Sequence, residues 1–196
     1  MAAAKDDYDS EFRYGGRPIE PLQTLDPSGR VIYVGSFSKT MPPTLRLGFV
    51  VAPAPLRKAV ETVKFVADWH TSLPTQAALC RFIDDGWLAR HVRKMRHVYQ
   101  ARHQQIVATL TRDFAQHLDV IPAAVGLHVT ATSHTVSSHE LDAVLRRASA
   151  AGVEAQSLSM YGVGASAPAG LVIGYGAIPT GRIEEGPSRL RSCFDP

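Results

Sequence analysis

The sequence is poor in the features that would place a protein in a membrane or outside the cell. It has two cysteines, Cys80 and Cys193, which lie far apart and outside any CxxC pair, so neither a disulfide framework nor a zinc site is indicated. The longest apolar stretch, from Leu47 to Leu56, contains prolines and falls far short of the roughly 18 to 20 residues of a spanning helix. The first residues run into an acidic segment without the apolar core of a signal peptide. We therefore expect a cytoplasmic protein without membrane association.

Neither the net charge nor the histidines indicate a particular ligand. The formal net charge is only +3, and the excess comes from one segment, Arg90 to Arg102. That segment could offer a basic surface to DNA, or it could be the solvated face of a helix with an apolar stripe beneath it. The eight histidines show no paired metal-ligand spacing, so we expect no metal site.

The first half of the chain has the pattern of an α/β fold. Residues 30–36 form a β-branched and aromatic run after a turn signal, which predicts a buried strand. Residues 47–52 predict a second strand, and Pro53-Ala-Pro55 opens a segment with helical spacing of apolar residues. Strands followed by helices in this order indicate α/β architecture.

The second half predicts a compact α+β lobe joined to the first half by a long helix. We expect three regions: residues 1–86, a connecting helix over 87–118, and a small domain over 119–196. The other elements expected are a helix from Thr75 to about Gly86, a strand over 126–132, a helix over 138–151, a strand over 171–175 and a helix from Arg182.

One short segment concentrates the chemistry. Lys39 follows the strand over 30–36, with Ser36 and Ser38 before it and Arg46 seven residues after it. The segment therefore places an amine beside hydroxyl and guanidinium donors that bind anions. An aldehyde cofactor with a phosphate group needs this combination.

This segment resembles the fold-type I, pyridoxal-phosphate (PLP) dependent enzymes of the class I and II aminotransferase group. Within that group it is most similar to the aminotransferase-like domain of the GabR/MocR family of transcriptional regulators. Asp6-Asp7-Tyr8 also matches the family's pattern, at the family's interval before Lys39, and the resemblance covers nearly the whole chain. It implies an α/β fold, the C-terminal part of the PLP-dependent transferase fold: an incomplete, mainly parallel sheet followed by a small α+β domain.

The resemblance also implies a role for each matching residue. Lys39 would form the internal aldimine with PLP and would act as the catalytic base and acid. Asp6 would face the pyridine nitrogen, and Tyr8 would hydrogen-bond the phenolic oxygen. Ser36 and Arg46 would hold the phosphate, and Ser38 would complete the set of cofactor-binding residues.

Two departures from the family pattern bear on activity. Only residues 1–5 precede Asp6, so we expect the N-terminal half of the large domain to be absent, together with any DNA-binding domain. That loss would weaken cofactor binding, expose a sheet edge at residues 30–36 and lower solubility. In addition, Val172 stands where many aminotransferases carry the arginine that binds the substrate carboxylate.

The function expected from the resemblance is PLP binding with action on an amine or amino acid, in a full-length protein that is a homodimer. If the protein is an enzyme, it is an aminotransferase. The alternatives are a non-catalytic, effector-sensing and dimerisation domain of a transcriptional regulator, or an inactive fragment. Since the regulators bind DNA through a different domain, we expect no direct DNA binding by this chain. Ser36-Phe37-Ser38-Lys39 also fits the S-x-x-K motif of penicillin-binding proteins, but the accompanying S-D-N and K-T-G motifs are absent.

Overall fold

The computed structural model describes residues 3–7, 10–15, 20, 22–123, 125–162 and 168–194. The chain divides into two compact units, an N-terminal unit of residues 1–94 and a C-terminal unit of residues 95–196. No helix within these described ranges is long and apolar enough to cross a membrane.

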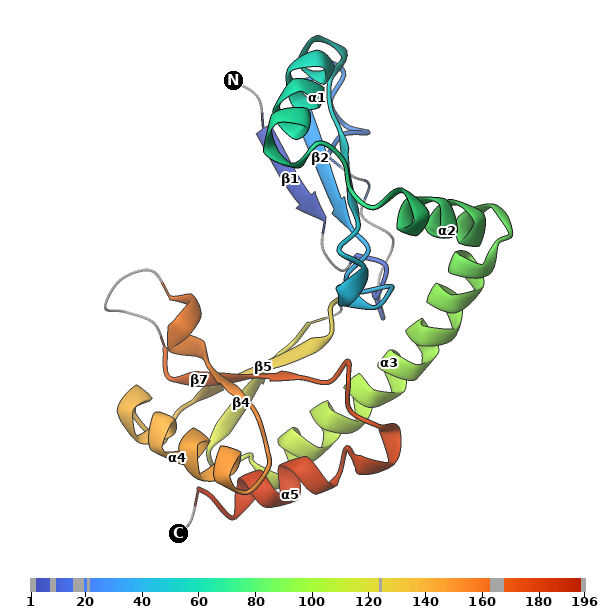
Figure 1. The fold of residues 1–196 in the computed structure, drawn as a ribbon. Helices are drawn as coiled ribbons and strands as arrows, with labels where there is room; N and C mark the ends of the chain where they lie inside the picture. The colour runs from blue at the N-terminus through green and yellow to red at the C-terminus, as the bar shows by residue number, and fades with distance from the viewer. Residues whose placement is uncertain are drawn as a thin grey trace. The chain divides into compact units, whose positions relative to one another are not determined.

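The N-terminal unit is built on a three-stranded sheet in the order β1-β2-β3 (Figure 1). Strands β1 (Ala3–Asp7) and β2 (Val31–Ser36) are parallel, whereas β3 (Gly48–Val51) folds back antiparallel to β2. The strands predicted over 30–36 and 47–52 are therefore confirmed. The prediction that residues 30–36 form an exposed edge of the sheet is wrong, because β2 is the central strand and pairs with a strand on each side.

Two glycines allow β2 and β3 to approach closely. A Cβ atom on Gly48 would lie 2.8 Å from the carbonyl oxygen of Gly35, and one on Gly35 would overlap the ring of Phe49. Phe49 in turn contacts the rings of Tyr33 and Phe37, with centroids 5.8 and 5.6 Å apart. Any side chain at position 48 would therefore push the hairpin open.

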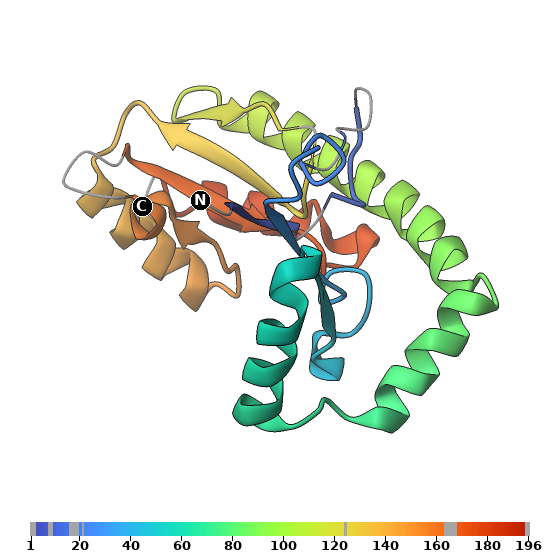
Figure 2. The same cartoon turned by 90° about the horizontal axis from the view of Figure 1, so that it is seen from above.

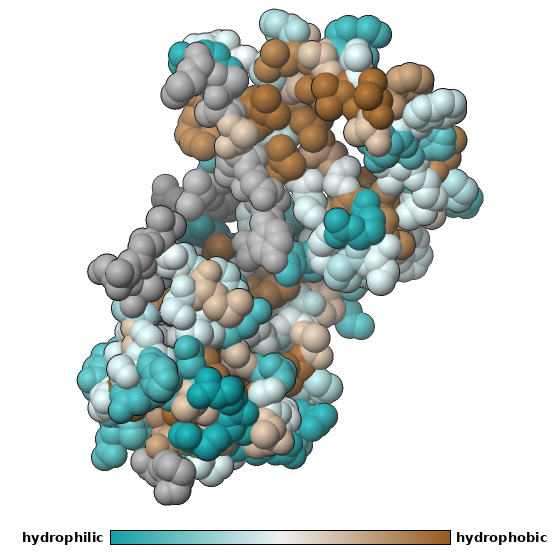
Figure 3. Space-filling view, turned by 60° about the vertical axis from the view of Figure 1, so that its left-hand side comes forward, coloured by the Kyte–Doolittle hydropathy of each residue, from teal (hydrophilic) through white to brown (hydrophobic). Residues whose placement is uncertain are grey.

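The helices of the N-terminal unit bury little of their surface. Helix α1 (Ala54–Asp68) starts after Pro53, as predicted, and has no buried residue, and in α2 (Leu73–Asp84) only Leu79 is buried. Figure 3 shows apolar surface on the face of this unit that it displays. Large apolar side chains are exposed on both helices, directly after α1 and on β3. They are Phe49, Val50, Val51, Val63, Phe65, Val66, Trp69, Leu73 and Ile83. A surface of this kind normally packs against other protein.

The C-terminal unit is a four-stranded antiparallel sheet in the order β4-β5-β7-β6, with helices α4 (Ser138–Ala150) and α5 (Glu185–Arg191) along one face (Figures 1 and 2). Its strands are β4 (Leu118–Ile121), β5 (His128–Ser133), β6 (Gln156–Ser157) and β7 (Gly170–Gly174). Short 3₁₀ helices follow β6 at Leu158–Tyr161 and β7 at Thr180–Arg182. The core of the unit is apolar and fully buried: Ile106, Leu110, Phe114, Val129, Ala131, Leu141, Leu171 and Leu190.

Two polar groups tie the loop after β7 to the rest of this unit. The hydroxyl of the fully buried Tyr175 donates to the carbonyl oxygen of Gly126 at 2.6 Å. Nη1 of Arg102 donates to the carbonyl oxygens of Tyr175 and Gly176 at 3.3 and 2.8 Å. The loop is thus held by one buried and two part-buried hydrogen bonds, and loss of the buried bond would leave a donor or an acceptor unpaired.

The sequence pattern placed the end of the long helix at Leu118. Helix α3 (Trp87–Asp113) ends earlier, at Asp113. Residues 114–117 form a turn in which the amide of His117 donates to the carbonyl oxygen of Phe114 at 2.8 Å. Phe114 and Leu118, which continue the apolar pattern of the helix, are buried in the core instead, and Leu118 begins β4.

The N-terminus of α4 is closed by a capping box. The amide of Glu140 donates to Oγ of Ser137, and the amide of Ser137 donates to Oε2 of Glu140 at 2.8 Å. The hydroxyl of Ser137 donates to the same Oε2 at 2.8 Å, and the bonds from the Ser137 amide and hydroxyl to the ionised carboxylate hold the pKa of Glu140 below its usual value.

Replacing Ser137 by alanine is expected to lower the free energy of unfolding by about 1 kcal/mol, because the amide of Glu140 loses its acceptor. Urea denaturation followed by circular dichroism measures this change. Ser138→Ala is the matched control, since Ser138 is the first residue of the helix and not its cap. Equal losses in both variants would contradict the role of the cap.

Candidate functional site

The candidate site lies at the carboxyl ends of the two parallel strands. The register pairs Asp6 with Val34 and Asp7 with Gly35, so β1 ends at the level where β2 runs into Ser36. In α/β sheets, ligands bind at this end of the strands. The side chain of Asp6 and the whole of Tyr8 lie outside the described part of the chain, so their approach to Lys39 remains a prediction.

The loop that carries Lys39 is closed at its base. The amide of Phe37 donates to the carbonyl oxygen of Leu47 at 3.1 Å, which joins the two ends of the loop directly beyond the β2–β3 ladder. Within the loop, the amides of Thr40 and Met41 both donate to the carbonyl oxygen of Phe37, at 3.2 and 2.7 Å. Thr40 is buried and its hydroxyl donates to the same oxygen at 3.3 Å. Lys39, which is half-buried, therefore sits in a tight, well-bonded turn.

The two serines before Lys39 contact each other. Oγ of Ser36 donates to Oγ of Ser38 at 3.0 Å, and the amide of Ser38 donates to Oγ of Ser36 at 3.2 Å. The two hydroxyls thus lie together at the end of β2, directly before the lysine in the chain. The amide of Ser38 and the hydroxyl of Ser36 are engaged within the loop, and the hydroxyl of Ser38 is the donor left for an anion. The structure brings Ser36 and Ser38 of the predicted site together, and Lys39 follows them in the same loop.

Arg46 is placed differently. It ends the short 3₁₀ helix Pro43–Leu45, with its amide donating to the carbonyl oxygen of Pro43 at 3.1 Å. Its backbone is left-handed, with φ 51°, a conformation that is unfavourable for residues other than glycine. The side chain is exposed, and among the described residues it forms no hydrogen bond or ion pair with the serines. Arg46 thus lies at the C-terminal end of the closed loop, immediately before Leu47.

A pocket of about 450 Å³ adjoins this loop within the N-terminal unit. Phe37, Leu47 and Gly48 line one side of it, and residues of α1, α2 and their connection line the other. In that connection the amide nitrogen of the Gln76 side chain donates to the carbonyl oxygen of Thr71 at 2.8 Å, and Nζ of Lys64 donates to Oγ1 of Thr71 at 3.2 Å. Sequence reasoning missed this pocket; the polar residues His70, Thr71 and Ser72 between two amphipathic helices were the available signal.

Val172 was expected to stand where a cation for the substrate carboxylate is missing. It lies in the middle of β7. Val172 pairs with Thr130 of β5 on one side and with Gln156 of β6 on the other. An apolar side chain therefore occupies a central register position of the small sheet.

Comparison with known proteins identifies the family. The model of the family "Aminotransferase class I and II" matches residues 6–169. This chain belongs to that family. The aminotransferase-type α/β fold expected from the sequence is thereby confirmed.

The curated relatives of this aminotransferase-family chain include several transcriptional regulators. It is 38% identical over 97% of its length to the probable rhizopine catabolism regulatory protein MocR of Rhizobium meliloti, and 32% identical over 98% of its length to the HTH-type regulator YhdI of Bacillus subtilis. It is 30% identical over 88% of its length to the pyridoxine biosynthesis regulator PdxR of Corynebacterium glutamicum. The chain spans 38%, 40% and 37% of these three proteins.

Solved aminotransferases share the fold. The multiple substrate aminotransferase of Thermococcus profundus superposes with a TM-score of 0.87 at 28% identity, over 98% of this chain and 47% of that protein. The kynurenine aminotransferase of Pyrococcus horikoshii, solved in complex with PMP, gives a TM-score of 0.87 at 25% identity, over 98% and 47% of the two chains. The chain thus spans about half of each solved relative.

Proposed function

We propose that this chain is part of a PLP-binding, aminotransferase-like domain that recognises an amine or amino acid, with Lys39 as the covalent attachment point of the cofactor. The observation that carries the proposal is the closed loop that gathers Ser36, Ser38 and Lys39 at the carboxyl ends of parallel strands. The family membership and a relative solved with PMP support it.

The described residues fit such a cofactor. The hydroxyl of Ser38 is a donor suited to a phosphate, the hydroxyl of Ser36 would become one on turning from Ser38 to the ligand, and Arg46 adds a positive charge on the same loop. When bound, PLP supplies an electron sink for the breaking of a bond at the substrate's α-carbon.

The remaining chemistry falls to side chains. Nζ of Lys39 would accept the proton from the substrate's α-carbon and return it, as general base and acid. The carboxylate of Asp6 would keep the proton on the ring nitrogen. The hydroxyl of Tyr8 would bind the phenolic oxygen.

A second function, effector sensing in a transcriptional regulator without turnover, is favoured by two observations. Several curated relatives that cover most of the chain are regulators. Val172 also leaves a central strand position without a cation for a substrate carboxylate.

In either role we propose that the full-length protein is a cytoplasmic homodimer and that this chain does not contact DNA directly. We also propose that the chain divides into regions 1–86, 87–118 and 119–196.

The function is tested by titrating the purified chain with PLP and recording absorbance near roughly 420 nm, where an imine between PLP and lysine absorbs. We expect a saturable band. 5′-Deoxypyridoxal, which lacks the phosphate and cannot close to an internal hemiacetal, is the matched control and should give a much weaker band, because the serines and Arg46 then have no anion to bind. The absence of a saturable band, or equal bands with both aldehydes, would overturn the proposal.

A further inference from the structure

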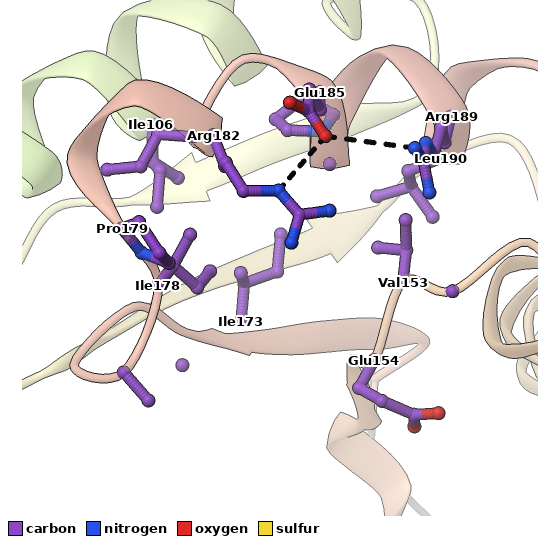
Figure 4. Close-up of a pocket in the computed structure, with 16 residues that line it drawn as sticks. Ile106, Val153, Glu154, Ile173, Ile178, Pro179, Arg182, Glu185, Arg189 and Leu190 are labelled. Carbon is purple, nitrogen blue, oxygen red and sulfur yellow. Dashed lines mark hydrogen bonds and ion pairs between the residues drawn. The ribbon is translucent and has the colours of Figure 1, made fainter.

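A second pocket lies wholly within the C-terminal unit and includes no residue of the proposed cofactor site. Its volume is about 360 Å³, within the range of small-molecule sites. It lies between strand β7, the 3₁₀ helix after it, α5 and the loop that follows α4 (Figure 4). Most of its wall is apolar, formed by Ile106, Val153, Ile173, Ile178, Pro179 and Leu190.

Charged side chains stand along one wall of this pocket. Oε2 of Glu185 accepts a hydrogen bond from Nε of Arg182 at 3.2 Å and lies 3.7 Å from Nη2 of Arg189. Glu185 therefore stands between two arginines, and the three groups together carry one net positive charge. Arg189 is also tied to the backbone, since its Nη1 donates to the carbonyl oxygen of Ala151 at 3.2 Å.

The guanidinium of Arg182 is oriented by this arrangement. Because Nε is engaged by Glu185, the two terminal nitrogens are directed away from Glu185 and over Ile173 (Figure 4). The side chain of Arg182 is 62% exposed, so it stands at the mouth of the pocket. Within the described ranges these terminal nitrogens have no protein acceptor. A planar pair of donors with this freedom matches the two oxygens of a carboxylate.

The other carboxylate of the lining does not cancel this preference. Glu154 lies at the opposite margin of the pocket, and its Oε1 accepts a hydrogen bond from Oγ of Ser149 at 2.6 Å (Figure 4). The positive charge thus lies on the wall that carries Arg182 and Arg189, and the floor beside it is apolar. Such a site favours a ligand with a negative end and a compact apolar body.

We propose that this pocket binds a small aliphatic monocarboxylate, with its carboxylate on the terminal nitrogens of Arg182 and its apolar body against Ile106, Val153 and Ile173. The ligand would touch β7 through Ile173, whereas the neighbouring Val172 points to the opposite face of the sheet. The proposal is independent of PLP binding.

The test is ligand-observed NMR with the whole chain, without PLP, using 4-methylpentanoate and its neutral isostere 4-methylpentanamide. We expect saturable binding of the carboxylate, with the amide about 10- to 100-fold weaker, because it lacks the charge that Arg182 recognises. Arg182→Gln should weaken the carboxylate by the same factor and leave the amide within about twofold. Arg146→Gln, which removes an exposed arginine of α4 outside the pocket, is the matched control and should change neither.

Three results would overturn the proposal. They are no saturable binding of the carboxylate, equal binding of carboxylate and amide, and equal weakening by Arg182→Gln and Arg146→Gln. The comparison of the two ligands needs no variant, so it holds even if a substitution impairs folding. A PLP titration of the same sample separates this outcome from that of the proposed function.

Discussion

Replacing Lys39 by alanine is expected to abolish site-specific covalent attachment of PLP to the chain. The lysines on the described helices are exposed to solvent. The side chain of Lys58, for example, is 89% exposed. Lys39 instead lies half-buried in a bonded turn beside two serine hydroxyls. An amine held next to the proposed phosphate-binding donors would react as part of a bound complex, whereas an exposed amine reacts only by collision.

Borohydride reduction followed by peptide mass mapping measures this attachment. In the unaltered chain the reduced adduct should lie on the peptide that contains Lys39, at one equivalent. Lys39→Ala should lose it entirely, and Lys58→Ala should keep it. Labelling spread over several lysines, unchanged by Lys39→Ala, would show that no site exists around this residue.

Phe114→Ala is expected to remove about 3 to 5 kcal/mol from the stability of the C-terminal unit. Phe114 is completely buried where the chain turns from α3 toward β4, and its ring contacts that of Phe194 edge to face, with centroids 5.8 Å apart. Truncation deletes the ring and leaves a cavity among the packed residues of the core. A loss of this size is a large part of the stability of an ordinary domain.

Hydrogen exchange of the β5 and β7 amides measures this loss within the unit that contains Phe114. Phe65→Ala is the matched control, because the ring of Phe65 is 58% exposed on α1 and contacts mainly that of Trp69, with centroids 5.5 Å apart. It should leave the exchange of these amides unchanged. If Phe114→Ala also left the exchange of these amides unchanged, the core of the C-terminal unit would not depend on this ring.

The elements that sequence patterns predicted best are those with local signals. Strand β2 follows a turn and is β-branched, and α1 opens with prolines, so each is encoded by adjacent residues. The contact between Ser36 and Ser38 is local as well, since the two residues lie two positions apart. Local chemistry of this kind can be read before any tertiary structure is known.

The features that escaped prediction depend on distant residues. Strand β6 has two residues and exists only because β7 pairs with it, and the central position of β2 depends on β3 folding back. The pocket above Ile173 needs the 3₁₀ helix Thr180–Arg182 and α5 to place Arg182 and Glu185 over a strand, and no spacing in the sequence encodes that arrangement. The side chains of Asp6 and Tyr8 would likewise reach Lys39 only through tertiary packing.

The hydrogen bond from Phe37 to Leu47 has a consequence for affinity. Because it closes the loop when β2 and β3 pair, the conformational entropy of ordering Ser36, Ser38 and Lys39 is lost during folding and not when a ligand binds. The loop is therefore preorganised, and an anion that binds there stabilises the β2–β3 hairpin in return. Ligand affinity and hairpin stability are thus linked quantities, and a substitution that opens the hairpin, such as a side chain at position 48, weakens binding without touching any residue of the site.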